Sequence, residues 1–247
     1  MTHSACYFHR SQRFYQYMYH YSLISMSEDK LEDSKERLIG SLKSRGYLKS
    51  ARVEQALRSV PREEFVLPGS RNQAYRDTPL SIAHGQTISA PHMCVIMCEA
   101  LDLKPGLKVL EVGAGCGYHA ALCADIVNDD NSGHVYTVEI VEKLINFARE
   151  NLERTGYSDK VTLIHGDGGK GLPEHAPFDR ILVAAAAPSV PKPLAEQLAP
   201  GGIMLIPIGS RGFYQELIMV LKSDDNKITE KRWGGVAFVP LTGEFGH

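Results

Sequence analysis

The chain has 247 residues and a formal net charge of −2, with 43% hydrophobic and 23% charged residues. This balance is typical of a folded globular domain and not of a disordered chain. Because the near-neutral charge provides no basic surface for a phosphate backbone, we expect no nucleic-acid partner. No apolar run approaches the roughly 18 residues that a membrane span needs, so we expect no membrane association.

The cysteines indicate a reducing compartment. They number five, and an odd count in a chain of this size argues against a secreted disulfide framework. We therefore expect a cytoplasmic protein. Cys94 and Cys98 would share one face of a helix and could in principle ligate a metal ion. Their neighbours Val95, Ile96 and Met97 favour core thiols instead, so we expect no metal.

Residues 1–26 differ in composition from the rest of the chain. They are rich in Tyr and His, carry several basic residues and contain no Asp or Glu. We interpret them as a disordered or dispensable extension, with Met26 as an alternative start. Their basic, acid-free composition also resembles a mitochondrial transit peptide. Residues 27–247 are then the folded domain.

Three helices are predicted ahead of the first long strand. Ser27 is a typical helix N-cap, and Leu and Ile residues recur at helical spacing until Gly46. A second helix is predicted for residues 51–59, ending before Pro61, and a third for about residues 92–101.

After these helices, strands and helices alternate. We predict strands at 108–112, 134–139, 161–165, 179–184, 203–208, 216–221 and 232–239, and helices at about 118–127, 141–155 and 191–198. Uninterrupted apolar strands are typical of a sheet covered on both faces, so the core should be a doubly wound α/β fold. The last two strands are joined by the turn-rich residues 223–226, which predicts an antiparallel hairpin at one edge.

The first of these strands runs into a glycine-rich loop. Residues 111–118 read Glu-Val-Gly-Ala-Gly-Cys-Gly-Tyr, and such glycines let the backbone approach a ligand at a helix start. The dinucleotide fingerprint G-x-G-x-x-G is not met, because Tyr118 stands where its third glycine belongs. An acidic residue followed by G-x-G-x-G instead resembles the loop of the seven-stranded, Rossmann-like S-adenosylmethionine-dependent methyltransferases. A tight turn without a ligand is the alternative.

Two more strand ends carry polar residues. Glu139 ends the second strand of the sheet, where an acidic side chain can accept hydrogen bonds from both hydroxyls of a ribose. Asp167 and Gly168 follow the third strand, and we expect them to contact an adenine edge. The carboxyl ends of parallel strands meet at one edge of a sheet, so the three positions predict one adenosine site.

Further segments narrow the substrate. They are residues 61–66 (Pro-Arg-Glu-Glu-Phe-Val), 85–92 (Gly-Gln-Thr-Ile-Ser-Ala-Pro-His), 166–168, 176–179, 184–188, 197–202 and 238–243 (Phe-Val-Pro-Leu-Thr-Gly). In order and spacing over roughly residues 28–245, the chain is similar to the protein-L-isoaspartate O-methyltransferase family. The resemblance implies that the domain has the seven-stranded methyltransferase fold, with N-terminal helices and an antiparallel C-terminal hairpin.

The resemblance also implies the roles of site residues. It makes Ser89 the catalytic residue, with Gln86, Thr87, Ile88 and Ser89 along the cofactor. It implies that Glu111, Gly113, Gly115 and Gly117 hold the methionine part, Glu139 the ribose, Asp167 and Gly168 the adenine, and that Thr242 contributes from a closing C-terminal loop. Cys116 departs from the family's usual Ser or Thr, and Cys94 from a His found in some members. His92 is not included among the catalytic residues.

The implied activity is methyl transfer from S-adenosyl-L-methionine to the free carboxylate of isoaspartyl residues in damaged proteins, which starts their repair and leaves S-adenosyl-L-homocysteine. The expected partners are isoaspartyl peptides and proteins, and we expect a monomer. One alternative is a methyltransferase of the same fold that acts on RNA or a small molecule. Another is a nucleoside-binding module without enzymatic activity. A serine hydrolase is disfavoured because Ser89 lacks the G-x-S-x-G elbow.

Overall fold

The computed structural model describes residues 28–129, 132–210 and 214–247. The predicted extension, residues 1–26, lies outside the described residues, so its interpretation stays a prediction. None of the helices in these ranges combines the length and apolar character that crossing a bilayer requires.

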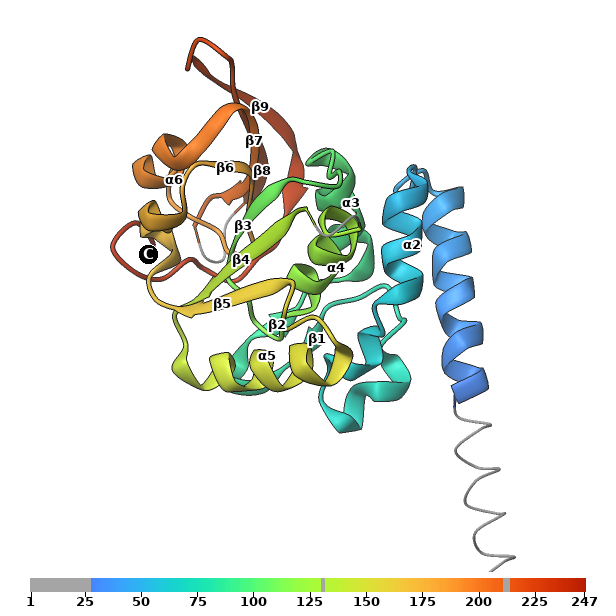
Figure 1. Cartoon of the computed structure of the whole chain (residues 1–247). Coiled ribbons are helices and arrows are strands. Elements are labelled where there is room, and N and C mark those ends of the chain that lie inside the picture. Colours follow the sequence, from blue (N-terminus) through green and yellow to red (C-terminus); the bar gives the residue numbers. More distant parts are fainter. Residues whose placement is uncertain (1–27, 130–131, 211–213) are drawn as a thin grey trace, which may run out of the picture.

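A seven-stranded sheet forms the centre of the domain (Figure 1). Its strands, in the order in which they lie side by side, are β5 (Val161–His165), β4 (His134–Glu139), β3 (Lys108–Val112), β6 (Phe178–Val183), β7 (Leu198–Ile208), β8 (Gln215–Lys222) and β9 (Ile228–Val236). The first five are parallel, and β8 and β9 are antiparallel to their neighbours. The predicted doubly wound core and edge hairpin are confirmed. The strand order reverses between β3 and β6, which is where such sheets bind ligands.

Two strands of the sheet differ from their predicted bounds by more than one residue. β7 begins at Leu198 and not at residue 203, because Leu198 already pairs with Phe178 ahead of an irregular register. The intervening Pro-Gly-Gly reads as a turn in sequence. β9 runs over Ile228–Val236 and not 232–239, since Ile228 pairs with Lys222 directly after the hairpin turn. This half of β9 is an exposed edge strand, so no apolar pattern indicates it.

Helices lie on both faces of the sheet. They are the helical residues 28–44, α2 (Ala51–Ser59), α3 (Pro91–Ala100), α4 (Tyr118–Val127), α5 (Glu142–Thr155) and α6 (Lys192–Gln197), each within about one residue of its prediction. Successive β3 residues face opposite sides. Val109 belongs to the larger hydrophobic cluster with residues of α2, α3, α4 and α5, whereas Leu110 and Val112 belong to a second cluster with α6.

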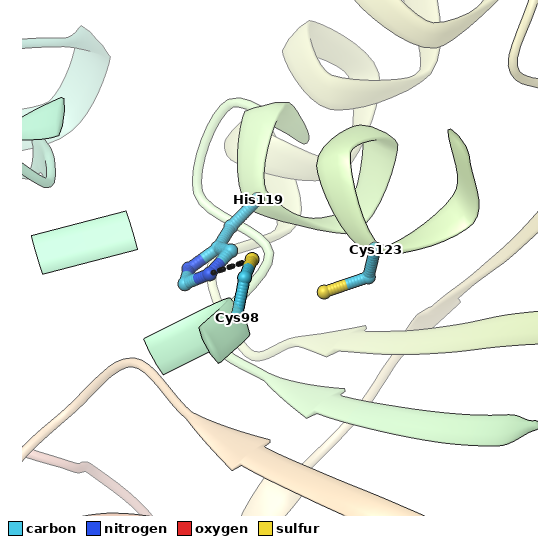
Figure 2. Close-up of side chains that lie close together, drawn as sticks. All are labelled: Cys98, His119 and Cys123. Atoms are coloured by element: carbon cyan, nitrogen blue, oxygen red, sulfur yellow. Dashed lines mark hydrogen bonds between the residues drawn. The ribbon is translucent and has the colours of Figure 1, made fainter. Parts of the chain in front are cut away.

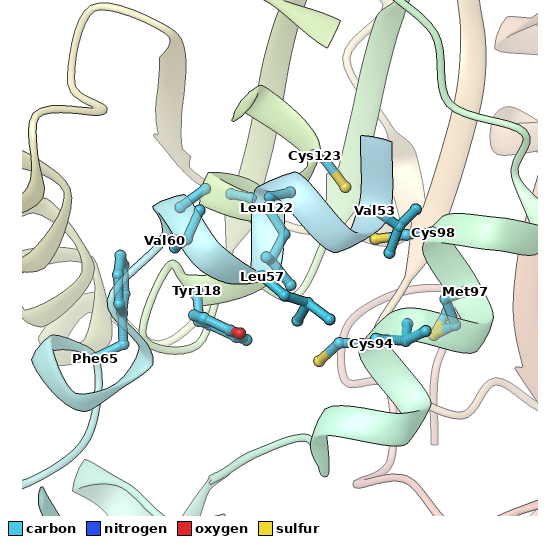
Figure 3. Packing of buried hydrophobic residues seen from close by; sticks show 14 of the residues in the cluster. Val53, Leu57, Val60, Phe65, Cys94, Met97, Cys98, Tyr118, Leu122 and Cys123 are labelled. Atoms are coloured by element: carbon cyan, nitrogen blue, oxygen red, sulfur yellow. The ribbon is translucent and has the colours of Figure 1, made fainter. Parts of the chain in front are cut away.

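The larger cluster joins α2, α3 and α4 (Figure 3). Val53 and Leu57 of α2, Met97 of α3 and Leu122 of α4 are at most 4% exposed. A polar contact joins α3 to the start of α2. Oε1 of Glu99 on α3 accepts hydrogen bonds from the backbone N–H groups of residues 49 and 50, both at 2.8 Å. The helices that precede and follow the site are thus packed in one core.

We expect Leu42→Ala to lower the free energy of unfolding by about 2–5 kcal/mol. Leu42 is 0% exposed and joins the N-terminal helix to the larger cluster, so its removal leaves a cavity. Ser41→Ala, an exposed neighbour, is the matched control and should change stability by less than about 0.5 kcal/mol. Urea unfolding of both variants measures the difference. Equal midpoints would show that this helix does not stabilise the domain.

Candidate active site

A cavity of about 340 Å³ opens at the carboxyl ends of β3 and β4. Ten of the twelve predicted cofactor residues line it: Gln86, Thr87, Ile88, Ser89, Glu111, Gly113, Gly115, Glu139, Gly168 and Thr242. They come from β2 (Thr87–Ile88), the ends of β3 and β4, the segment after β5 and the C-terminal segment. The fold therefore brings together residues that are more than 150 positions apart in sequence.

Glu139 holds the glycine loop against the start of α5. One carboxylate oxygen accepts a hydrogen bond from the Gly115 N–H at 2.9 Å, and the other accepts one from the Val141 N–H at 2.9 Å. The Gly113 N–H donates to the carbonyl of Val138 at 2.8 Å. Gly113 and Gly115 both have positive φ, 93° and 55°, which disfavours any other residue. Each Glu139 oxygen keeps a lone pair for a further donor.

Glu111 is a buried carboxylate without a cation beside it in the described contacts. It is 1% exposed, and its Oε2 accepts a hydrogen bond from the Thr137 hydroxyl at 2.5 Å. Its Oε1 has no hydrogen-bond partner among the described residues. Burial raises the pKa of Glu111 to about 7. A buried acceptor of this kind in a cavity wall is suited to a ligand that carries a positive charge and donor hydrogens.

Asp167 fastens the C-terminal segment over the cavity. Its side chain accepts a hydrogen bond from the Gly169 N–H at 3.0 Å and one from the Glu244 N–H at 2.8 Å. It does not line the cavity, although Gly168 does. A Cβ on Gly168 would lie 2.5 Å from Cγ1 of Val112, so only glycine fits there. In this structure Asp167 shapes the site through the backbone of residues 168–169 and 244.

Gly117 is the second predicted residue outside the cavity wall. It caps the start of α4 with φ 87°, and a Cβ there would lie 3.2 Å from Cγ of Leu152 on α5. Its glycine is required by the turn and by the close approach of α5. The spacing of the three glycines thus indicates the loop, but only the first two face the cavity.

Ser89 lies where two cavities meet. It lines the 340 Å³ cavity and also a second groove of about 500 Å³, together with Thr87, Ala184 and Val239. The exposed Tyr214, 71% accessible, lines this second groove. A ligand in the cavity and another in the groove would therefore meet at Ser89.

Arg62 fixes the backbone of Ser89 through a hydrogen bond to its carbonyl. It is 0% exposed, its Nη2 donates to the Ser89 carbonyl at 2.7 Å, and its Nε donates to the Ala74 carbonyl at 2.8 Å. Its guanidinium also lies 4.7 Å from the ring centre of Tyr118. Arg62 thus holds the backbone at Ala74 and the backbone at Ser89 in one arrangement. Arg62 lies within the family-like segment 61–66, but its sequence context predicts no role for it.

His92, which is not among the predicted catalytic residues, contacts Asp77. Its Nδ1 lies 2.8 Å from Oδ1 of Asp77, which also accepts a hydrogen bond from the His92 backbone N–H at 2.9 Å. Asp77 also pairs with Arg45 at 2.6 Å. These contacts anchor the start of α3 beside the groove.

Sixteen residues of the cavity wall were not among the predicted cofactor residues. They are Gly85, Cys94, Val112, Ala114, Cys116, Tyr118, His119, Val138, Ile140, Val141, Leu144, Ala184, Ala185, Val239, Pro240 and Leu241. Ile140 and Val141 directly follow Glu139, so an apolar pair after the acidic strand end was an available signal. His119 and Cys94 carry no such signal, because only the packing of α3 and α4 brings them to the wall.

Comparison with known proteins identifies the family. The family model described as protein-L-isoaspartate(D-aspartate) O-methyltransferase matches residues 33–246. A protein-L-isoaspartate O-methyltransferase from Hyperthermus butylicus is 53% identical over 224 residues, covering 89% of this chain and 92% of that protein. One from Methanopyrus kandleri is 56% identical over 213 residues, covering 86% and 93%.

A solved structure agrees with these sequences. It is a protein-L-isoaspartate O-methyltransferase from Plasmodium falciparum in complex with S-adenosyl-L-homocysteine. It has a TM-score of 0.74 and 32% identity, and the match covers 83% of this chain and 97% of that one. The chain therefore belongs to the protein-L-isoaspartate(D-aspartate) O-methyltransferase family.

Proposed function

We propose that this protein transfers the methyl group of S-adenosyl-L-methionine to the free carboxylate of isoaspartyl residues in proteins. The observation that carries the proposal is the position of Ser89 between the cofactor cavity and the second groove. Family membership supports the reaction, and the cavity at the ends of β3 and β4 supports the cofactor. Transfer leaves S-adenosyl-L-homocysteine in the cavity and starts repair of the damaged residue.

The cofactor is assigned to the cavity because its ammonium group and its ribose hydroxyls match acceptors in the cavity wall. Each oxygen of Glu139 already accepts one backbone hydrogen bond, and its remaining lone pairs suit the two ribose hydroxyls. Glu111 Oε1 suits the ammonium of the methionine part, because it is a buried acceptor without a partner among the described residues. Ile140 and Val141 supply apolar surface for the adenine ring.

The reaction needs no general base. A free carboxylate with a pKa near ~4 is ionised at neutral pH, so it attacks the sulfonium methyl directly. A strong cation on the acceptor would weaken it as a nucleophile, whereas the hydroxyl of Ser89 can orient it with a neutral hydrogen bond. Alignment of the two reactants makes the largest contribution to lowering the activation free energy, on the order of 7–11 kcal/mol in favourable cases. Arg62 contributes indirectly by fixing the Ser89 backbone.

The groove must distinguish isoaspartate from aspartate by backbone geometry. In an isoaspartyl linkage the main chain runs through the side-chain carbon, so the carboxylate sits on a shorter arm. Residues 239–241 are held extended by two hydrogen bonds with Ala186: its N–H donates to the Val239 carbonyl and its carbonyl accepts from the Leu241 N–H. We propose that the substrate peptide lies extended along this segment through main-chain hydrogen bonds, which would tolerate many flanking side chains.

We expect methyl transfer to an isoaspartyl peptide and none to the matched aspartyl peptide. Ser89→Ala should lower kcat/KM by about tenfold or more, because it removes one oriented hydrogen bond, with S-adenosylmethionine affinity changed less than about twofold. The measurement is transfer of labelled methyl together with calorimetric binding of the cofactor.

Ser158→Ala is the control for this experiment, because Ser158 is exposed and lines neither cavity. Equal labelling of both peptides would contradict the substrate assignment. Labelling of RNA or of small molecules by a protein inactive on peptides would favour the alternative methyltransferase. Cofactor binding without transfer to any acceptor would favour the nucleoside-binding module.

We expect Glu111→Gln to stabilise the cofactor-free protein at pH 8 but not at pH 5. The folded pKa of about 7 lies above the ordinary value of 4.5, so the folded state binds the proton more tightly than the unfolded chain. The wild type therefore loses stability as the pH rises from about 4.5 to 7, by up to about 3 kcal/mol. Chemical unfolding at the two pH values measures the difference.

The control for this test is Glu150→Gln, an exposed glutamate on α5. It should shift stability little at either pH. A Glu111→Gln variant as stable as the wild type at pH 8 would contradict the buried-carboxylate assignment. The same variant should bind S-adenosylmethionine more weakly if Oε1 contacts its ammonium.

A further inference from the structure

Three side chains with metal-ligating atoms meet in the core beside the cavity. Cys98 belongs to α3, while His119 and Cys123 lie one turn apart on α4, and all three are buried (Figure 2). Their ligand atoms all lie within 4.8 Å of one another. In Figure 2 the Cys98 sulfur lies beside the His119 ring, and the Cys123 side chain comes from the same helix as His119. Two sulfurs and one imidazole nitrogen are ligands that zinc prefers.

The spacing is close to that of ligands around one tetrahedral zinc ion. Bonds of about 2.3 Å to sulfur and 2.0–2.1 Å to nitrogen put a sulfur and a nitrogen ligand about 3.5 Å apart, and two sulfurs about 3.8 Å apart. The observed distance from Cys98 Sγ to His119 Nε2 is 3.5 Å. The other separations are at most 4.8 Å, so side-chain adjustments of about 1 Å would complete the geometry.

We propose that Cys98, His119 and Cys123 bind one zinc ion, Cys98 and Cys123 as thiolates and His119 as neutral imidazole through Nε2. Binding releases one proton from each thiol, and the two negative sulfurs balance the charge of the ion. This balance matters in the core, where an unpaired charge is costly. Three protein ligands leave a fourth coordination position for water. Because His119 also lines the cofactor cavity, the ion lies at the wall of that cavity.

Zinc at this position connects the two helices that carry the site loops. α3 begins at Pro91, two residues after Ser89, and α4 begins at Tyr118, directly after the glycine loop. A metal link from Cys98 to His119 and Cys123 therefore restrains both loops relative to each other. The stabilisation is independent of methyl transfer and is measured without it.

The expectation of no metal considered Cys94 and Cys98 as the pair. Cys94 is not part of the cluster in the structure: its sulfur lies 4.0 Å from the Ser89 carbonyl, and Cys94 lines the cavity. Cys98 instead meets two residues of another helix. Cys94 is consequently a matched control, since it is a buried cysteine one turn away on the same helix.

The test is metal titration of the full chain after chelator treatment under reducing conditions. Cobalt(II) should bind at one equivalent per chain and give a thiolate-to-cobalt charge-transfer band with visible bands of tetrahedral intensity. Zinc(II) should displace it and bleach the bands. Cys94→Ala should keep one equivalent, whereas the double variant Cys98→Ala with Cys123→Ala should retain less than about a tenth of it at the same metal concentration.

A second measurement covers the case in which the double variant does not fold. Zinc(II) at about 100 times its Kd should lower the unfolding equilibrium constant of the wild type about 100-fold, and EDTA should reverse the effect. His119→Asn should remove most of this stabilisation. A cobalt complex without a thiolate band, bands that persist in the double variant, a zinc-independent unfolding constant, or a Cys98–Cys123 disulfide in the freshly isolated protein would each overturn the proposal.

Discussion

The site depends on one carboxylate that joins two strand ends. Glu139 accepts hydrogen bonds from Gly115 after β3 and from Val141 before α5, so the glycine loop and the start of α5 are held in one geometry. The loop itself is possible because Gly113 and Gly115 adopt positive φ. The same carboxylate lines the cavity, where the proposed ribose would find an acceptor that is already oriented and costs little to order.

Two buried side-chain atoms have unsatisfied hydrogen-bonding capacity in the described part of the protein. Among the described residues, the only buried side-chain nitrogen or oxygen atoms without a hydrogen-bond partner are Arg62 Nη1 and Glu111 Oε1. Arg62 uses its other donors to fix Ala74 and Ser89. Glu111 differs from Arg62 in charge. Burial raises its pKa, so a cationic ligand beside the carboxylate would stabilise its ionised form. The residue proposed to bind the cofactor and the residue that fixes Ser89 therefore also affect the stability of the cofactor-free protein.

The proposed methyltransferase site and the proposed zinc site share the helices α3 and α4. α3 follows Ser89 and α4 follows the glycine loop, and both pack against α2 through the larger hydrophobic cluster. That packing buries Cys98, His119 and Cys123, so the proposed zinc site would lie in the core and not on an exposed surface. A restraint between α3 and α4 acts on the relative position of the two loops that the proposed reaction requires to be aligned.

By itself the sequence determined the order of elements and most of the cavity. Glycine spacing, apolar strands and an acidic strand end depend on local backbone geometry and burial period, so they are readable along the chain. Ten of the twelve predicted cofactor residues line the cavity, whereas Gly117 and Asp167 act through the turn of α4 and the C-terminal backbone. Only the tertiary structure decided the start of β7 and β9, the contact of Arg62 with Ser89, and the meeting of Cys98 with α4. These features arise from contacts between segments distant in sequence, and side-chain packing sets such contacts without leaving a local pattern.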